Sequence, residues 1–150
     1  MKEIYYTYNN EAISSCIFLS ILNYINSLDI ARSCLFLPFL LDDRTISSLQ
    51  KTKYIEIDLD QFIQQQPRLF LSFNKRYLSL LPVTINSLML LNKSNQIDIG
   101  KHITTKSTLN IENIDLGDRF NKIKEVIPIL LSMIGKYSTM ELYKILNIQL

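Results

Sequence analysis

Few side chains in this sequence could carry out chemistry, and their spacing does not assemble a catalytic set. The one histidine, His102, has no partners at the spacing of a catalytic triad or a zinc site. Two acidic pairs, Asp42-Asp43 and Asp58-x-Asp60, could each hold a divalent cation. Both stand where helices are expected to begin, and there a carboxylate satisfies free backbone amides and the helix dipole. We therefore expect these aspartates to cap helices and His102 to be an exposed residue of a hairpin.

The two cysteines and the glycines exclude other kinds of site. Cys16 and Cys34 each lie in an apolar run and form no CxxC pair, which favours buried, reduced thiols in the cytoplasm. With three glycines and no glycine-rich loop followed by Lys-Ser or Lys-Thr, the chain cannot build the phosphate cradle of an ATPase. The sequence thus predicts a protein that is not an enzyme and binds no metal or cofactor of its own.

Positive charge is concentrated in one part of the chain. The formal net charge is only +2, from 16 basic and 14 acidic residues, yet residues 68–108 contain six cations and one acid. Such a segment could contact nucleic acid phosphates without reading sequence, or could dock on an acidic partner; the two interpretations are about equally supported. The candidate residues for this basic surface are Arg68, Lys75, Arg76, Lys93 and Lys101.

Both ends of the sequence contain several large aromatic or aliphatic side chains. Tyrosine is a favoured anchor at protein interfaces, and three tyrosines precede the first expected helix: Tyr5, Tyr6 and Tyr8. The last expected helix presents a second group, Leu142, Tyr143 and Leu146. We expect one of these two ends to bind a partner protein, and packing into the core is the competing explanation for each.

The elements that position these residues are expected to be mostly helical, with one small β-hairpin. A chain of 150 residues, 47% of them hydrophobic, suits one domain, and few glycines and prolines favour helices over a many-turned sandwich. We expect N-terminal helices over residues 1–55, a winged-helix-like unit over 57–104 and C-terminal helices over 118–150. The longest apolar run, Cys34 to Leu41, is too short to span a membrane, so no membrane association is expected.

Periodicity assigns the N-terminal helices. Asn9 or Asn10 can cap a helix whose buried stripe is Ile13, Ile17, Ile21, Tyr24 and Leu28. Residues 33–41 are apolar on every side and are expected to form the centre of the core. A short helix, capped by Asp43 or Thr45, is expected to follow as far as Leu49.

Prolines divide the middle of the chain. Pro67 and Pro82 stand near the expected starts of two helices, giving helices over 58–66, 68–80 and 83–92. Alternating apolar residues then predict a hairpin over 97–103, and three helices closed by a hairpin describe a winged helix. If Ile85, Leu88 and Met89 face the core, the third helix offers DNA no arginine or lysine for reading base pairs.

The C-terminal part is expected to contain two helices. The first should run from Asp118 to about Gly135, with a bend at Pro128. Ser138 followed by Glu141 is a capping-box pattern that opens the last helix.

Four ordered stretches carry a resemblance to a known family. They are YNNEAISSCIFLSILNYI (8–25), CLFLPFLLDDRTISSL (34–49), IDLDQFIQQQPRLFLSFNKRYLSLLPVTINSLMLLNKSNQIDI (57–99) and STMELYKILNIQL (138–150). Together they resemble the small middle component of three-component ABC ATPase systems, to which the Lamassu antiphage defence systems belong. The sequence departs from the family where Asn9-Asn10 replaces the usual Asn-Pro and where Ser94-Asn95-Gln96 replaces an apolar-Gly-apolar step.

The resemblance implies a non-catalytic adaptor between an SMC-like ABC ATPase and a nuclease-type effector, with ATP and magnesium bound only by the ATPase. A winged helix would suit this role, since kleisin-type partners of SMC ATPases grip the ATPase heads with winged helices. We expect Lys75, Arg76, Lys93 and Lys101 to affect the DNA affinity of the assembled complex more than folding. The alternative is a stand-alone winged-helix DNA-binding regulator.

Overall fold

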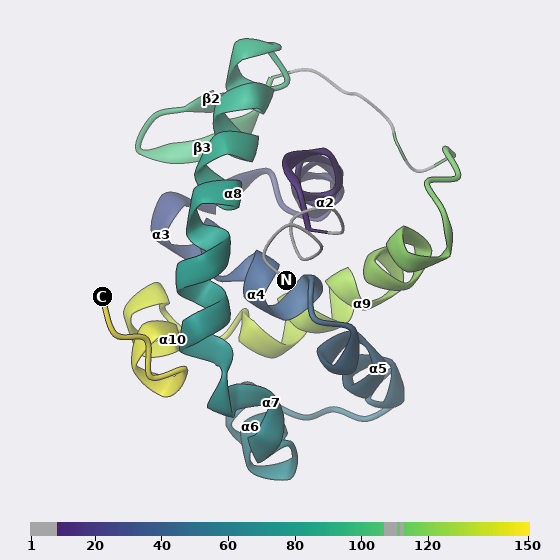
Figure 1. Cartoon of the computed structure of the whole chain (residues 1–150), viewed down its shortest axis with the longest axis vertical. Coiled ribbons are helices and arrows are strands. Elements are labelled where there is room, and N and C mark those ends of the chain that lie inside the picture. Colours follow the sequence, from purple (N-terminus) through teal and green to yellow (C-terminus); the bar gives the residue numbers. More distant parts are fainter. Residues whose placement is uncertain (1–8, 107–110, 112) are drawn as a thin grey trace.

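The computed structural model describes residues 9–106, 111 and 113–150 and confirms a mostly helical fold with a small sheet. The helices surround the central segment that contains α4, and the sheet lies at one end of the molecule (Figure 1). Expected elements at residues 1–8 lie outside the described residues. The first elements are α2 (Glu11–Tyr24), β1 (Ser27–Asp29), α3 (Ile30–Ser33), α4 (Phe36–Leu40) and α5 (Asp43–Lys51).

Helix α2 begins as expected and ends sooner. The Asn10 side chain accepts hydrogen bonds from the Ala12 and Ile13 amides, which confirms the predicted cap. The helix stops at Tyr24, which is exposed, and Leu28 lies in β1, so the predicted stripe is wrong beyond Ile21. Leu28 is buried by pairing with Ile103 of the hairpin, a long-range contact that helical periodicity cannot reveal.

The central apolar run is confirmed as core. Every residue from 35 to 41 is buried, including Pro38 inside α4. The Phe39 ring lies 4.8 Å from the Phe73 ring and 6.1 Å from the Phe70 ring, measured between centroids. Residues from α4, α7 and α8 therefore meet in one aromatic cluster.

The middle of the chain forms α6 (Leu59–Gln65), α7 (Pro67–Leu71) and α8 (Phe73–Lys93). Pro67 opens α7 as predicted. Pro82 does not open a helix, because α8 continues through it for 21 residues; the separate helices 68–80 and 83–92 are wrong. Pro82 is exposed, so water can satisfy the backbone carbonyl that its missing N–H leaves free, and packing along α8 outweighs the local cost.

The predicted hairpin is present as β2 (Ile97–Ile99) and β3 (His102–Thr105). Strand β1 pairs antiparallel with β3, giving the order β1-β3-β2, so the sheet is not confined to residues 57–104. The inward residues Ile97 and Ile103 are fully buried against the helices, whereas His102 is exposed as expected.

The C-terminal helices are α9 (Asp118–Ile134), with Pro128 inside it, and α10 (Thr139–Ile145). The Ser138 hydroxyl accepts the Glu141 amide at 3.1 Å, confirming the predicted N-cap. Helix α9 packs against α2 and α5. Helix α10 lies beside the lower half of α8 in Figure 1.

The continuity of α8 gives a stability prediction. We expect Pro82→Ala to raise the free energy of unfolding by about 1–2 kcal/mol, because alanine restores the missing helical hydrogen bond at an exposed position. The matched control is Pro67→Ala, which should lower it by no more than about 1 kcal/mol, since proline suits a first helical turn. Urea unfolding followed by circular dichroism measures both, and a destabilised Pro82→Ala variant would contradict a continuous α8.

Candidate partner-binding surfaces

One aspartate of each pair singled out in the sequence serves as a helix cap. The Asp42 carboxylate accepts the Thr45 amide and hydroxyl at 3.1 and 2.7 Å, so the cap of α5 is Asp42, not Asp43 or Thr45. Asp58 and Gln61 form a reciprocal capping box at the start of α6. The Gln61 amide, and after it Lys136, lowers the pKa of the Asp58 carboxyl. In the part of the chain that the structure describes, no three His, Cys, Asp or Glu side chains group as metal ligands.

Neither cysteine is placed for catalysis. Both are free thiols and only half-buried, where full burial was expected. Desolvation raises the pKa of Cys16, and it is also the main cause of the raised pKa of Cys34. A raised pKa keeps a thiol protonated and therefore a poor nucleophile.

The basic residues do not form one surface. Arg68 and Lys75 are exposed at α7 and the start of α8, whereas Lys93 and Lys101 are exposed at the far end of α8 and in the hairpin turn. Lys75 and Lys93 are 18 residues apart on one helix, which at 1.5 Å per residue is about 27 Å. The structure therefore separates the candidates into two pairs of cations at opposite ends of α8.

The fifth candidate, Arg76, is half-buried and bound to the protein's own backbone. Its Nε donates to the Pro38 carbonyl at 3.1 Å, and Nη1 donates to the Leu69 carbonyl at 3.0 Å and to Ser72 Oγ at 2.7 Å. Its guanidinium also lies 5.3 Å from the centroid of the Phe73 ring. Arg76 thus joins α4, α7 and α8, which differs from the expectation that folding is indifferent to its loss.

The C-terminal candidates pack against the core, which favours the competing packing explanation for them. Leu142 and Leu146 are buried, and Tyr143 is half-buried. The Tyr143 hydroxyl donates to the Ala31 carbonyl at 2.6 Å and lies 3.2 Å from the Tyr77 hydroxyl. Burial, and after it the Tyr77 contact, raises the pKa of Tyr143 far above its usual value. The other group, Tyr5, Tyr6 and Tyr8, lies outside the described residues.

Polar contacts also hold α10 against α3. Thr139 Oγ1 donates to Asp29 Oδ2 at 2.6 Å and accepts from Arg32 Nε at 3.1 Å, and Arg32 also donates to the Tyr137 carbonyl. Burial opposes ionisation of Asp29, but hydrogen bonds from Thr139 and backbone amides outweigh it and lower the pKa of the carboxyl. Helix α10, one of the two candidates for binding a partner, is therefore held against its own chain.

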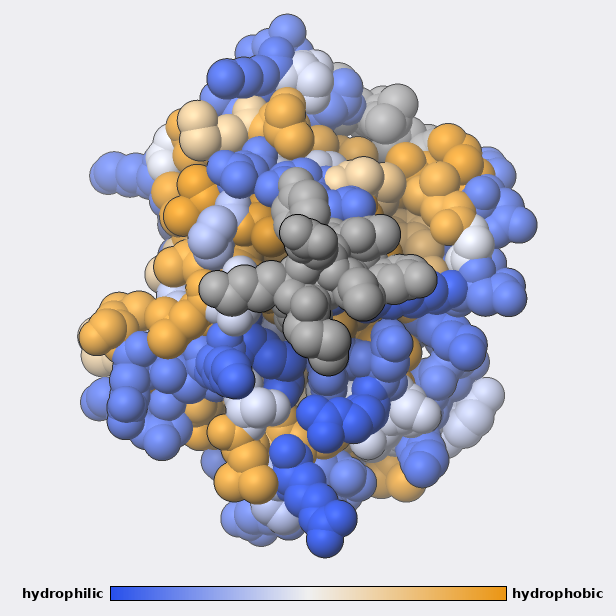
Figure 2. Space-filling view, in the orientation of Figure 1, coloured by the Kyte–Doolittle hydropathy of each residue, from blue (hydrophilic) through white to orange (hydrophobic). Residues whose placement is uncertain are grey.

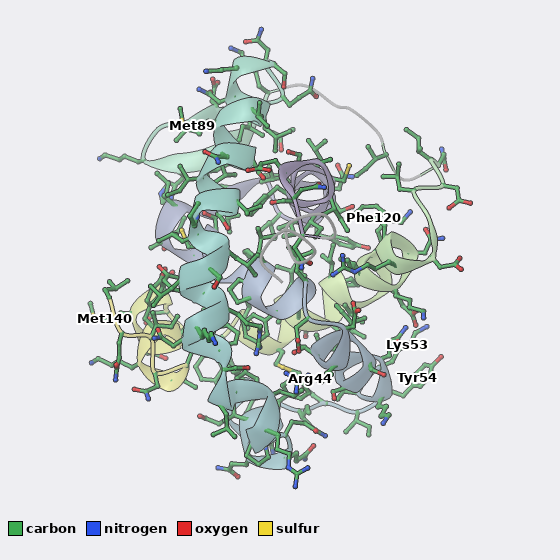
Figure 3. All side chains as sticks on the ribbon, in the orientation of Figure 1. Arg44, Lys53, Tyr54, Met89, Phe120 and Met140 are labelled. Carbon is green, nitrogen blue, oxygen red and sulfur yellow. The ribbon has the colours of Figure 1, made fainter. Side chains whose placement is uncertain are left out.

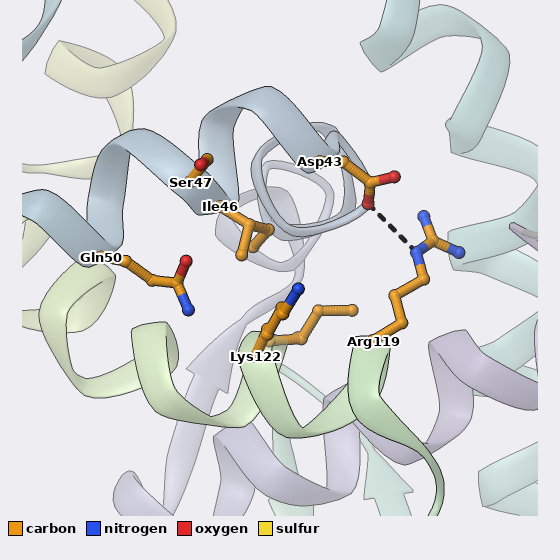
Figure 4. Close-up of a pocket in the computed structure, with 7 residues that line it drawn as sticks. Asp43, Ile46, Ser47, Gln50, Arg119 and Lys122 are labelled. Atoms are coloured by element: carbon orange, nitrogen blue, oxygen red, sulfur yellow. Dashed lines mark hydrogen bonds and ion pairs between the residues drawn. The ribbon is translucent and has the colours of Figure 1, made fainter.

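A hollow of about 420 Å³ lies between α5 and α9. Figure 4 shows Gln50 and Lys122 reaching into this space, and Arg119 donating to Asp43 at 3.2 Å across it. Arg119 also donates to Asn9 Oδ1 at 2.8 Å and to the Leu41 carbonyl at 3.3 Å, which ties α9 to the start of α2 and the end of α4. Asp43, the carboxylate in its lining, is engaged by Arg119, and the lining is as polar as it is apolar, so the hollow lacks the mostly apolar character of a substrate pocket.

The feature that the sequence interpretation missed is an apolar stripe on the outside of α8. Val83 and Leu88 face the core, whereas Ile85 and Met89, which were expected to face inwards, are 48% and 49% exposed. Met89 lies beside the upper half of α8 in Figure 3. We define the α8 stripe as the exposed residues Leu78, Pro82, Ile85 and Met89. The signal was available, because α8 read as one continuous helix is apolar on both faces.

Comparison with known proteins gives one family match. The family described as ABC-three component (ABC-3C) system Middle Component 3 matches residues 1–150. No curated protein and no solved structure matches the chain. Among the helices that the structure describes, none has the length and apolar character needed to cross a membrane.

The contacts of Arg76 predict a cost in folding. We expect Arg76→Ala to lower the free energy of unfolding by about 2 kcal/mol, because the Pro38 and Leu69 carbonyls lose a charged donor. The neighbouring exposed Lys75→Ala should change it by less than about 0.5 kcal/mol. Chemical denaturation of both variants measures the difference, and equal stabilities would show that the Arg76 contacts do not support the fold.

The burial of Leu142 predicts a second difference within one helix. Leu142→Ala should cost about 2–5 kcal/mol of folding stability, because it leaves a cavity under α10. The control is Met140→Ala, whose side chain is 70% exposed and should cost less than about 0.5 kcal/mol. If Leu142→Ala instead folded with full stability and lost binding to a partner subunit, Leu142 would be an interface anchor.

Proposed function

The chain belongs to the ABC-three component (ABC-3C) system Middle Component 3 family, and on this premise we propose that it is a non-catalytic adaptor. Membership in a three-component system implies protein partners, among them an ABC ATPase. In the proposal, the chain links an SMC-like ABC ATPase to a nuclease-type effector in a Lamassu-like antiphage complex of the cytoplasm. ATP and magnesium are bound by the ATPase. The family match over the whole chain carries this proposal.

The described surface supports binding over catalysis. Of the acidic side chains that could hold a cation, Asp42 and Asp58 cap helices and Asp43 is paired with Arg119, and the half-buried thiols have raised pKa values. In contrast, an exposed apolar stripe runs along the longest helix. Exposed apolar side chains arranged in one line are a usual feature of protein-binding faces.

The arrangement of elements supports a winged-helix-like unit, but its helices and strands are not the ones expected within residues 57–104. Helices α2 and α4 both pack against α8, and the β2–β3 hairpin follows α8 and closes the group. Strand β1, which follows α2, pairs with β3 at the edge of the sheet. We propose this unit, rather than residues 57–104, as the part that docks on an ATPase, by analogy with winged helices of kleisin-type proteins.

The alternative function, a stand-alone DNA-binding regulator, has less support. A regulator of this kind would present polar and basic side chains of one helix to the major groove. The exposed side of α8 instead carries Leu78, Ile85 and Met89, with lysines only near its two ends. Non-specific contact of the exposed cations Arg68 and Lys101 with DNA, made within the assembled complex, remains part of the proposal.

Co-expression tests the adaptor proposal. We expect the chain, the ABC ATPase and the third component of its system to copurify as one complex. Leaving out this chain should separate the other two, and an ABC ATPase from an unrelated system is the specificity control. The purified chain alone should neither hydrolyse ATP nor cut DNA. Either activity in the isolated chain, or nanomolar sequence-selective DNA binding without partners, would contradict the proposal.

A further inference from the structure

The α8 stripe is a continuous line of exposed side chains. Its residues follow the spacing i, i+4, i+7, i+11, which at 100° per residue places Leu78, Pro82, Ile85 and Met89 within a sector of about 60°. Along the helix axis the stripe is about 16 Å long, or three turns. Figure 2 shows hydrophobic side chains lying among hydrophilic ones on this side of the molecule.

This stripe is not the edge of the core. The opposite face of α8, which includes Tyr77, Leu80, Val83 and Leu91, is buried against the rest of the chain. The stripe therefore lies on the far side of a helix that has already used one face for folding. Three of its side chains are 48% or 49% exposed, so each keeps about half of its surface open to a partner.

Positive charge beside the α8 stripe favours a partner segment with acidic side chains. Between Asp60 and Asp98 the sequence contains no acidic residue, so α7 and α8 carry only cations. Lys75 and Lys93 are both exposed and lie about 60° round the helix from Leu78, one before the stripe and one after it. At the edge facing α2, Glu11 accepts a hydrogen bond from Asn86 at 3.1 Å.

A second copy of this chain fits the stripe poorly. If two α8 helices paired antiparallel through their stripes, Lys75 of one would approach Lys93 of the other. If they paired parallel, the two copies of each lysine would lie on opposite sides of the contact, and α8 offers no acidic side chain to meet them. The antiparallel arrangement thus brings like charges together, which opposes association, and the parallel arrangement gains no ion pair.

We propose that the α8 stripe binds an amphipathic helix of a partner subunit, with acidic side chains flanking the apolar face of that helix. This inference rests on the proposed function and adds the surface and the chemistry of the partner segment. Apolar residues at three- and four-residue spacing on the partner helix pack along Leu78, Ile85 and Met89, and its carboxylates meet Lys75 and Lys93. The apolar contact provides affinity, and the two lysines fix the orientation and exclude basic segments.

Substitutions in the α8 stripe, compared with a substitution on another side of α8, test the apolar contact. The purified full chain is titrated with each of the other two purified subunits of its system. Ile85→Gln and Met89→Gln should weaken binding to one subunit about tenfold or more, because each buries an unpaired amide at the contact. The matched control is Leu90→Gln, since Leu90 is 53% exposed but lies about 100° round α8 from Met89, and the substitution leaves the charge beside Lys93 unchanged; it should bind within about twofold of wild type. Unchanged binding of the stripe variants would overturn the inference.

Charge reversal tests the second part of the inference. The Lys75→Glu, Lys93→Glu double variant should bind more weakly at low salt, and the difference from wild type should shrink as salt rises. Lys51→Glu, an exposed lysine in the last turn of α5, is the control and should leave the affinity unchanged. A double variant that bound as tightly as wild type at low salt would contradict an acidic partner.

Photo-cross-linking identifies the partner segment without relying on a destabilised variant. p-Benzoylphenylalanine replaces Met89 in the otherwise wild-type chain, and the cross-linked peptide is identified by mass spectrometry within the complex. The expected peptide comes from a partner subunit, has helical apolar spacing and carries net negative charge. A basic peptide, a peptide of a second copy or a DNA adduct would overturn the inference. If the wild-type chain bound neither subunit, the proposed function would fail first, and this outcome is distinct from stripe variants that bind normally.

Discussion

Helix α8 has more apolar surface than the core of this chain can cover, and the rest of the structure follows from how that surface is divided. Its inner face receives α2, α4 and β2, and Phe73 at its start joins the aromatic cluster around Phe39. Its outer face keeps Leu78, Ile85 and Met89 half-exposed. A long helix with two apolar faces is stable in a small protein only when one face is buried internally, and the other is then available to a partner.

Three arginines connect the helices around this arrangement. Arg32 donates to the Tyr137 carbonyl, Arg76 to those of Pro38 and Leu69, and Arg119 to that of Leu41. Most of these carbonyls lie near helix ends, where backbone acceptors have no partner within their own helix. The planar guanidinium carries several donors in a fixed geometry and can satisfy acceptors of different helices at once. Part of the positive charge in the sequence therefore serves the fold and is not available for DNA.

Local patterns predicted much of this fold. The cap at Asn10, the capping role of Asp58 and the buried run 35–41 were visible, because each depends on residues a few positions apart. The errors came from long-range contacts. Leu28 continues a helical spacing but pairs with Ile103, and Pro82 reads as a helix start although packing along α8 carries the helix through it. That second error concealed the stripe, since dividing α8 at Pro82 gave two short helices and left the exposed side of the second unrecognised.

The most direct test of a partner-covered α8 face is methyl NMR of the chain labelled at its methionine methyl groups. Met89 lies in the stripe, Met140 is 70% exposed on α10, and Met133 is buried, so the three report on separate regions. When the partner subunits of the system are added, the account predicts that the Met89 signal shifts or broadens while those of Met140 and Met133 keep their positions. A complex in which Met140 responds and Met89 does not would contradict it.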